Sequence, residues 1–311
     1  MIDEHYHMNR KENRRSKSLS EGKVNSEVSA KFLGSHLTGF FALVVALTAF
    51  SPESTSAAPK RTRPTAAPKT AAPSGVVYQE FRGPNGAVIH WLADQMPLKV
   101  YIAPGTSLDS IIDPALGAPA TSTGNLDHWP DLVASVIQNP EQMQSLQPAV
   151  GYVPEHYQAA VEGINSWLQV AHGNYSYQIV QDPSDADIYV FWTNHFVNKL
   201  GLALFENDIR GYTAKRSFPL AAVQAAVQAG RQIDFKPVVT LLRTTEASGL
   251  PMPVAKLRAS AAHEFGHALG IEGHSRNPND LMSVFYGHGA ISAGDAATIN
   301  YLYRLSPNYI P

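Results

Sequence analysis

Two histidines and a glutamate in the C-terminal part of the chain have the types and spacing of a catalytic metal site. His263 and His267 are four residues apart, and Glu264 directly follows the first of them. On a helix their β-carbons lie about 5–6 Å apart on one face, so both imidazoles can bind one ion. Glu264 then projects near the ion without having to bind it, as a general base requires. This pattern predicts a zinc site that activates water.

The surrounding residues predict the helix that this spacing needs. Apolar side chains recur at three- and four-residue steps between Val254 and Phe265, which is the pattern of a helix with one face against a core. Pro253 suits the first turn, and Gly270 suits the end. We therefore expect a helix over residues 253–269.

A catalytic zinc needs three protein ligands and an open position, and His274 is the best candidate for the third ligand. In a continuous helix it would lie about 16 Å along the axis from His263. Gly270 and Gly273 let the chain leave the helix and turn back toward the ion. Other side chains compete for this place: Glu272, Asp280, His288 and, on a later helix, Asp295.

Five further histidines are isolated in the sequence, and we expect each of them to lie on the surface or to pack in the core rather than to bind a metal. They are His90, His128, His156, His172 and His195.

Residues 263–275, HEFGHALGIEGHS, resemble the zinc signature of the metzincin metallopeptidases, most closely the matrixin-like branch. In that family the third histidine comes three positions after the glycine. Here it comes four positions after, with Gly273 as the extra residue, similar to a variant of bacterial matrixin-like sequences. Residues 280–283 and 291–303 resemble the Met-turn and the C-terminal helix of the family, and residues 96–102 and 186–191 resemble its first and third strands.

The resemblance implies a zinc endopeptidase that acts on protein or peptide substrates. Zn²⁺ on His263, His267 and His274 would polarise the scissile carbonyl, while Glu264 takes a proton from bound water and later delivers it to the leaving amine. Met282 would be a hydrophobic floor beneath the metal. Residues 283–289, with Phe285 and Tyr286, would line the pocket for the residue after the cut bond. Animal matrixins use a cysteine for latency, which this chain lacks.

The remaining periodicities predict an α+β domain. Residues 97–104 alternate as a strand does, and residues 187–192 and 236–243 are rich in β-branched and aromatic residues. Residues 154–173 have the apolar spacing of a helix, 200–213 suit an irregular edge strand, and 105–150 suit a surface insertion with one short helix near residue 130. We expect a zincin-like, mixed twisted sheet with helices on one side, an active-site helix and a small C-terminal helical subdomain.

The N-terminal residues have the pattern of a targeting segment. Basic residues are frequent in residues 1–31 and are followed by an apolar run at 37–50. This run is shorter than the roughly 20 residues of a membrane-spanning helix, and small residues follow it. We interpret residues 1–57 as a signal peptide cut near Ala57, which makes the protein secreted or extracytoplasmic. An uncleaved membrane anchor and a later start at Met8 are the alternatives, and only an uncleaved segment would contact the membrane.

Composition bounds the remaining possibilities. Residues 58–75 contain no apolar side chain larger than alanine or proline, so they predict an exposed linker ahead of a catalytic domain at 76–311. A formal net charge of −2 provides no basic surface for nucleic acid. The chain has no cysteine, so histidine and carboxylate must hold any metal. A non-catalytic exported binding domain with a structural zinc is the alternative function, although a closed site needs no base.

Overall fold

The computed structural model describes part of the chain. The described residues are 75–83, 88–113, 118–119, 128–197, 203–204, 209–216, 221, 224–225, 228–229, 235–284 and 289–307. All of them belong to the second of the two units into which the chain divides, residues 67–311. The expected signal peptide and nearly all of the expected linker lie outside the described residues.

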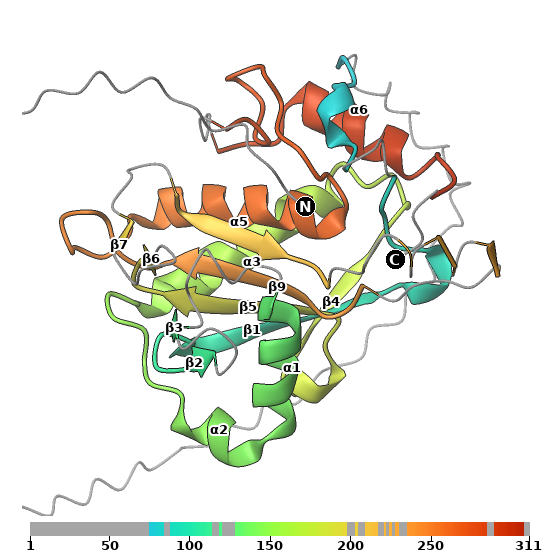
Figure 1. The fold of residues 1–311 in the computed structure, drawn as a ribbon. Helices are drawn as coiled ribbons and strands as arrows, with labels where there is room; N and C mark the ends of the chain where they lie inside the picture. The colour runs from blue at the N-terminus through green and yellow to red at the C-terminus, as the bar shows by residue number, and fades with distance from the viewer. Residues whose placement is uncertain are drawn as a thin grey trace, which may run out of the picture. The chain divides into compact units, whose positions relative to one another are not determined.

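A five-stranded mixed sheet is the framework of the described domain (Figure 1). Its order is β4-β1-β5-β9-β8, and only β8 runs antiparallel to its neighbour. The strands are β1 (Leu98–Ser107), β4 (Tyr177–Val180), β5 (Ile188–Thr193), β8 (Gly211–Ala214) and β9 (Val238–Arg243). Every residue of β5 and β9 is buried, because both faces of the sheet centre are covered.

Two helices pack side by side on one face of the sheet: α3 (Pro154–Leu168) and α5 (Val254–Leu269) (Figure 1). They approach so closely that a β-carbon at Gly163 would stand 2.5 Å from the carbonyl oxygen of Arg258. Trp167 fixes the pair further, because its indole N–H donates to the carbonyl of Ala262 at 2.7 Å. Helix α5 is therefore held rigidly on α3.

Helix α1 (Trp129–Gln138) covers the opposite face of the sheet. On strand β8, Thr213 points toward α5 and contacts Glu264, so its neighbour Tyr212 points to the other face. There Tyr212 meets the ring of Trp129 at 6.2 Å between centroids. The expectation that helices cover one side only is therefore wrong.

The shorter elements complete the domain. Helix α2 (Pro140–Ser145) follows α1, and α6 (Ala293–Leu302) lies near the C-terminus. Two small strand pairs are β2 (Ile112–Asp113) with β3 (Ala118–Pro119), and β6 (Phe196–Val197) with β7 (Ala203–Leu204). Single 3-10 turns are η1 (Gln79–Phe81), η3 (Ala93–Gln95) and η5 (Pro183–Asp185). Among the described residues no helix combines the length and apolar character that crossing a bilayer requires.

The predicted α+β class with a mixed sheet is confirmed, and several boundaries differ. The first strand continues to Ser107, the expected helix over 154–173 ends at Leu168, and the expected strand over 236–243 begins at Val238, after Pro237. The region 105–150 is no simple surface insertion, because α1 buries Trp129 and Val133 in the core. Strand β4 was not predicted, since it is short and its side chains are partly buried or, at Gln178, exposed.

Gly163 provides a test of the contact between α3 and α5. Alanine is the better helix former, yet Gly163→Ala should lower the free energy of unfolding by about 1–3 kcal/mol, because the added methyl group overpacks the interface. Urea unfolding measures this. Gln158→Ala, on an exposed position of the same helix, is the control and should change stability by less than ~0.5 kcal/mol. Equal stability of Gly163→Ala and the parent would contradict the close packing.

Candidate metal centre

The end of α5 turns the chain back toward its own last turns. Gly270 has φ 119° and ψ 3°, and its N–H donates to the carbonyl of His267 at 3.0 Å. A β-carbon here would also overlap the carbonyl oxygen of Ile89. The left-handed conformation and the close approach both require glycine. The helix therefore stops where the sequence predicts it, and residues 271–275 run back along it.

This turn brings three imidazoles together. The ligand nitrogens of His263, His267 and His274 all lie within 4.8 Å of one another, and the ring centroids are 4.9–5.2 Å apart. In the described part of the chain, these three histidines form the cluster of possible ligand residues that is compact enough to hold one metal ion. The structure thus assembles the three histidines that the sequence singled out.

Backbone carbonyls set the tautomers of two of these histidines. Nδ1 of His263 lies 2.7 Å from the carbonyl oxygen of Leu281, and Nδ1 of His267 lies 2.6 Å from that of Ile271. A carbonyl oxygen only accepts, so each Nδ1 carries the proton and donates it. Each Nε2 is then left with a lone pair, which is the form that binds a metal.

The donor set fits a zinc ion. Nε2 of His267 and Nε2 of His274 are 3.3 Å apart. Two nitrogens that bind one tetrahedral zinc at about 2.0–2.1 Å are separated by roughly the same distance. Three imidazoles leave one position of the tetrahedron for another ligand, as in catalytic zinc sites.

Burial keeps the three imidazoles uncharged at neutral pH. It lowers the pKa of His263 to about 4, and the neighbouring His274 lowers it further against the opposing effect of the hydrogen bond to Leu281. Burial also holds the pKa of His267 well below its ordinary value, and lowers that of His274. Neutral imidazoles are ready to bind a cation without first losing a proton.

Glu264 is part of α5, its side chain lies against β8, and the residue is only 2% exposed. Burial raises the pKa of its carboxyl to about 8, although the hydroxyl of Thr213, which donates to Oε2 at 3.0 Å, lowers it in part. Gly211 leaves the space for this side chain, since a β-carbon there would stand 2.5 Å from Cγ of Glu264. Sequence reasoning missed Thr213 and Gly211, because only strand pairing brings them to α5.

The competing carboxylates have other partners. Asp295 accepts the N–H groups of Leu281, Met282 and Ser292 at 2.7, 3.2 and 2.9 Å. Asp280 accepts from Ser292 at 2.7 Å, as well as from Ser275 and Asn277, and Glu272 forms an ion pair with Lys215. None of these carboxylates joins the histidine group. His288, the fourth competitor, lies outside the described residues.

The turn at residues 280–283 lies directly beneath α5. Met282 is fully buried, and its sulfur occupies the place that a β-carbon on Gly266 would need. Leu281, the preceding residue, holds the imidazole of His263 through its carbonyl. Met282 is therefore placed as an apolar support under the helix segment between the two histidines. Phe285 and Tyr286, the expected pocket wall, lie outside the described residues.

Two isolated histidines have the expected packing roles. His156 is fully buried, and its Nε2 lies 2.7 Å from the carbonyl oxygen of Met252. His90 lies between the carbonyl oxygens of Trp91 and Leu305, each at 2.9 Å. His172 is exposed.

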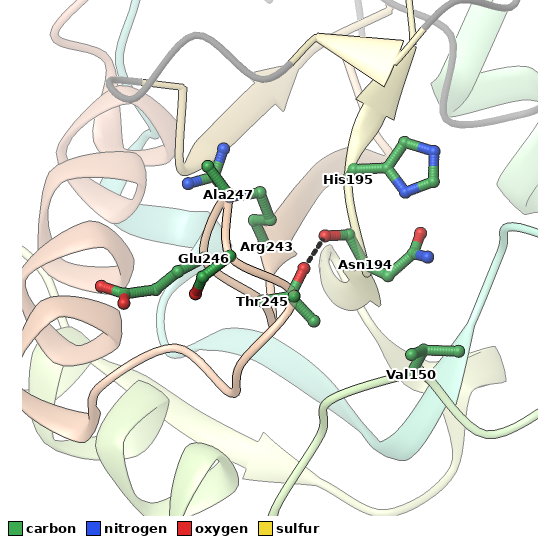
Figure 2. A pocket seen from close by; sticks show the side chains of 9 residues that line it. Val150, Asn194, His195, Arg243, Thr245, Glu246 and Ala247 are labelled. Carbon is green, nitrogen blue, oxygen red and sulfur yellow. Dashed lines mark hydrogen bonds between the residues drawn. The ribbon is translucent and has the colours of Figure 1, made fainter.

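A separate hollow lies at the carboxyl ends of β5 and β9 (Figure 2). Figure 2 shows Arg243 and Glu246 on one side of it and His195 on the other, and the hydroxyl of Thr245 donates to the carbonyl of Asn194. Glu246 also binds Lys256 at 2.6 Å. None of the three clustered histidines lines this hollow, so it is not part of the metal centre.

The lowered pKa values predict how stability depends on pH in chelator-treated protein. Between pH 6.5 and about 4 the unfolded chain binds more protons than the folded one, so stability present above pH 6.5 is lost as the pH falls. His263→Asn keeps a side-chain donor for the carbonyl of Leu281 but cannot take up a proton. Its free energy of unfolding should therefore fall by on the order of 3 kcal/mol less than that of the parent over this pH range. Urea unfolding at several pH values measures it. The exposed His172→Asn is the control, and equal slopes for both variants would contradict the prediction.

Comparison with known proteins agrees with this geometry. Residues 157–304 match the model of the matrixin family. A stretch of 54 residues is 44% identical to the 72 kDa type IV collagenase of Gallus gallus, and it covers 16% of this chain and 8% of the collagenase. The likeness to the collagenase therefore spans a small part of that protein. The matched region contains α5, the three histidines and the turn at Met282, and this part of the chain is similar to a matrixin domain.

Proposed function

We propose that the protein is an exported zinc endopeptidase in which Glu264 is the general base. The observation that carries the proposal is the meeting of three neutral imidazoles, two of them oriented by carbonyls so that Nε2 is available for a metal. The similarity of residues 157–304 to the matrixin family supports the same reaction class. His263, His267 and His274 would hold the ion.

The zinc ion, when bound, supplies a Lewis acid that acidifies water and polarises a peptide carbonyl. The chain itself supplies the proton transfers. Glu264 takes a proton from the attacking water and delivers it to the leaving amine. With a cation held by the three histidines, the ionised form of the Glu264 carboxyl group would be favoured and its raised pKa lowered, so Glu264 would be a competent base near neutral pH.

Thr213 and Gly211 position the base. The hydroxyl of Thr213 lies 3.0 Å from both Oε2 and the backbone carbonyl of Glu264, so it ties strand β8 to the active-site helix. Gly211 lets the carboxylate lie against the strand without a clash. A base held by a neighbouring element keeps the orientation that proton transfer needs.

The site of action follows from the N-terminal sequence. A basic segment, a short apolar run and small residues over positions 1–57 are typical of a signal peptide, so we infer secretion or an extracytoplasmic location with protein or peptide substrates. An uncleaved segment would instead anchor the enzyme to a membrane. N-terminal sequencing of the mature protein separates these outcomes, since cleavage near Ala57 is expected.

Replacement of Glu264 by glutamine tests the role of the base. Glu264→Gln keeps the size of the side chain and all three histidines, so zinc should still bind, while peptide hydrolysis should fall by about 10²–10⁴-fold. Digestion of a peptide library with and without a zinc chelator measures activity, metal dependence and cleavage preference together. Unchanged hydrolysis by Glu264→Gln would contradict this role. If the parent protein cleaves no peptide in the library, the alternative of a binding domain with a structural zinc is favoured.

Zinc content separates the competing third ligands. His274→Ala should lower zinc affinity by more than about 10-fold. Loss of a group that only supports a ligand already costs about that much, and His274 would be a ligand itself. Asp295→Asn should retain one zinc per chain and lower the melting temperature, because buried N–H groups of the turn at residues 280–283 lose an acceptor. Metal analysis and thermal unfolding measure both. Full zinc in His274→Ala, with zinc lost from Asp295→Asn, would assign the third ligand to the carboxylate.

A further inference from the structure

A short stretch at the start of the described domain lies between α6 and the loop that carries His274. We call residues 78–82 the N-terminal segment and residues 270–275 the ligand loop. Phe81 anchors the N-terminal segment, since it is 1% exposed and meets the ring of Tyr301 on α6 edge to face. Tyr78 adds two hydrogen bonds to α6, from its N–H to the hydroxyl of Thr298 and from its phenol to Asp295, both at 3.2 Å.

The other side of the N-terminal segment contacts the ligand loop through its backbone. The carbonyl of Phe81 accepts the N–H of Glu272 at 2.9 Å. The carbonyl of Glu80 lies so close to Gly273 that a β-carbon there would overlap it. The Glu80 carboxylate also binds Arg276, with Oε1 2.8 Å from Nε. These contacts lie immediately before and shortly after His274 in the sequence.

His274 depends on its backbone more than the other two histidines do. His263 and His267 stand on a packed helix, and carbonyls orient both rings. Among the described residues no carbonyl orients the ring of His274, whose Nε2 lies 3.3 Å from Nε2 of His267. On the C-terminal side of His274, Ser275 donates its N–H to the carbonyl of Met282 at 2.7 Å. The N-terminal segment restrains the backbone on the N-terminal side of His274, at Glu272 and Gly273.

We propose that the N-terminal segment positions the third zinc ligand. This inference rests on the proposed zinc site. The ligand loop has one residue more than the family's usual spacing, and an extra residue adds conformational freedom that must be lost when the imidazole binds. Contact of Glu80 and Phe81 with the loop removes that freedom before the metal arrives. Gly273 is then needed because only a residue without a β-carbon admits the carbonyl of Glu80.

The test measures zinc affinity in the full chain by competition with a chelator of known affinity. Gly273→Ala pushes the loop away from Glu80, and Phe81→Ala removes the anchor of the N-terminal segment. Each should lower zinc affinity about 10–100-fold, as loss of a supporting group around a metal site does. Phe81→Leu restores an apolar anchor and should return affinity to within about threefold of the parent. The absorption bands of bound Co²⁺ should shift in the two weakened variants, because the histidine coordination changes.

Two controls separate positioning from a general loss of stability. Gly151→Ala creates a similar overlap, with Cγ2 of Thr245, away from the ligand loop and from α6. Leu108→Ala removes a buried apolar side chain outside the N-terminal segment. Both should bind zinc as the parent does. Parent-like affinity in Gly273→Ala and Phe81→Ala, or an equal loss in Leu108→Ala, would overturn the inference.

The same titration distinguishes this inference from the proposed function. Zinc binding by the parent chain that His274→Ala weakens supports the three-histidine site, whatever the N-terminal segment does. If that dependence holds and the variants at Phe81 and Gly273 bind normally, the positioning role alone fails. If His274→Ala binds zinc as tightly as the parent does, the proposed set of three histidine ligands is wrong, and with it the basis of the positioning role.

Discussion

The geometry of an α-helix is the constraint on which the rest of the structure depends. A four-residue step places two imidazoles on one face, but a third ligand on the same helix would lie too far along its axis. The chain must therefore leave the helix at once and return, and Gly270 permits this through its left-handed conformation and its contact with Ile89. Every other feature of the proposed site either holds the helix still or holds the returning loop.

Rigid support of α5 comes from elements that are distant in sequence. Helix α3 packs against it where Gly163 leaves no gap, and Trp167 donates to its backbone. Strand β8 contributes Thr213 from the other side. Asp295, at the start of α6, gathers the N–H groups of the turn that contains Met282 and so keeps Leu281 in place to orient His263. Asp295 thus acts on His263 indirectly, through the turn at residues 280–283.

Burial gives the site its electrostatic character. Removing water from His263 and His267 favours their neutral forms, and removing water from Glu264 favours its protonated form. The chelated protein therefore holds its ligands uncharged and its base protonated at neutral pH. In the proposed enzyme, a zinc ion held by the three imidazoles would favour the ionised form of the Glu264 carboxyl group.

Local patterns in the sequence determined the helix over residues 253–269, its end at Gly270, the pairing of His263 with His267 and the place of Glu264 beside them. All of these depend on contacts a few residues apart, which the 3.6-residue period and glycine chemistry specify. Tertiary structure alone decided that Asp295 holds the turn at residues 280–283, that α1 covers the second face, and that Thr213 reaches Glu264. Those contacts join residues 14 to 83 positions apart, and pairing between distant strands and helices leaves no period in the sequence to read. The return of His274 belongs to both, since glycines permitted the turn and packing against the N-terminal segment selected its path.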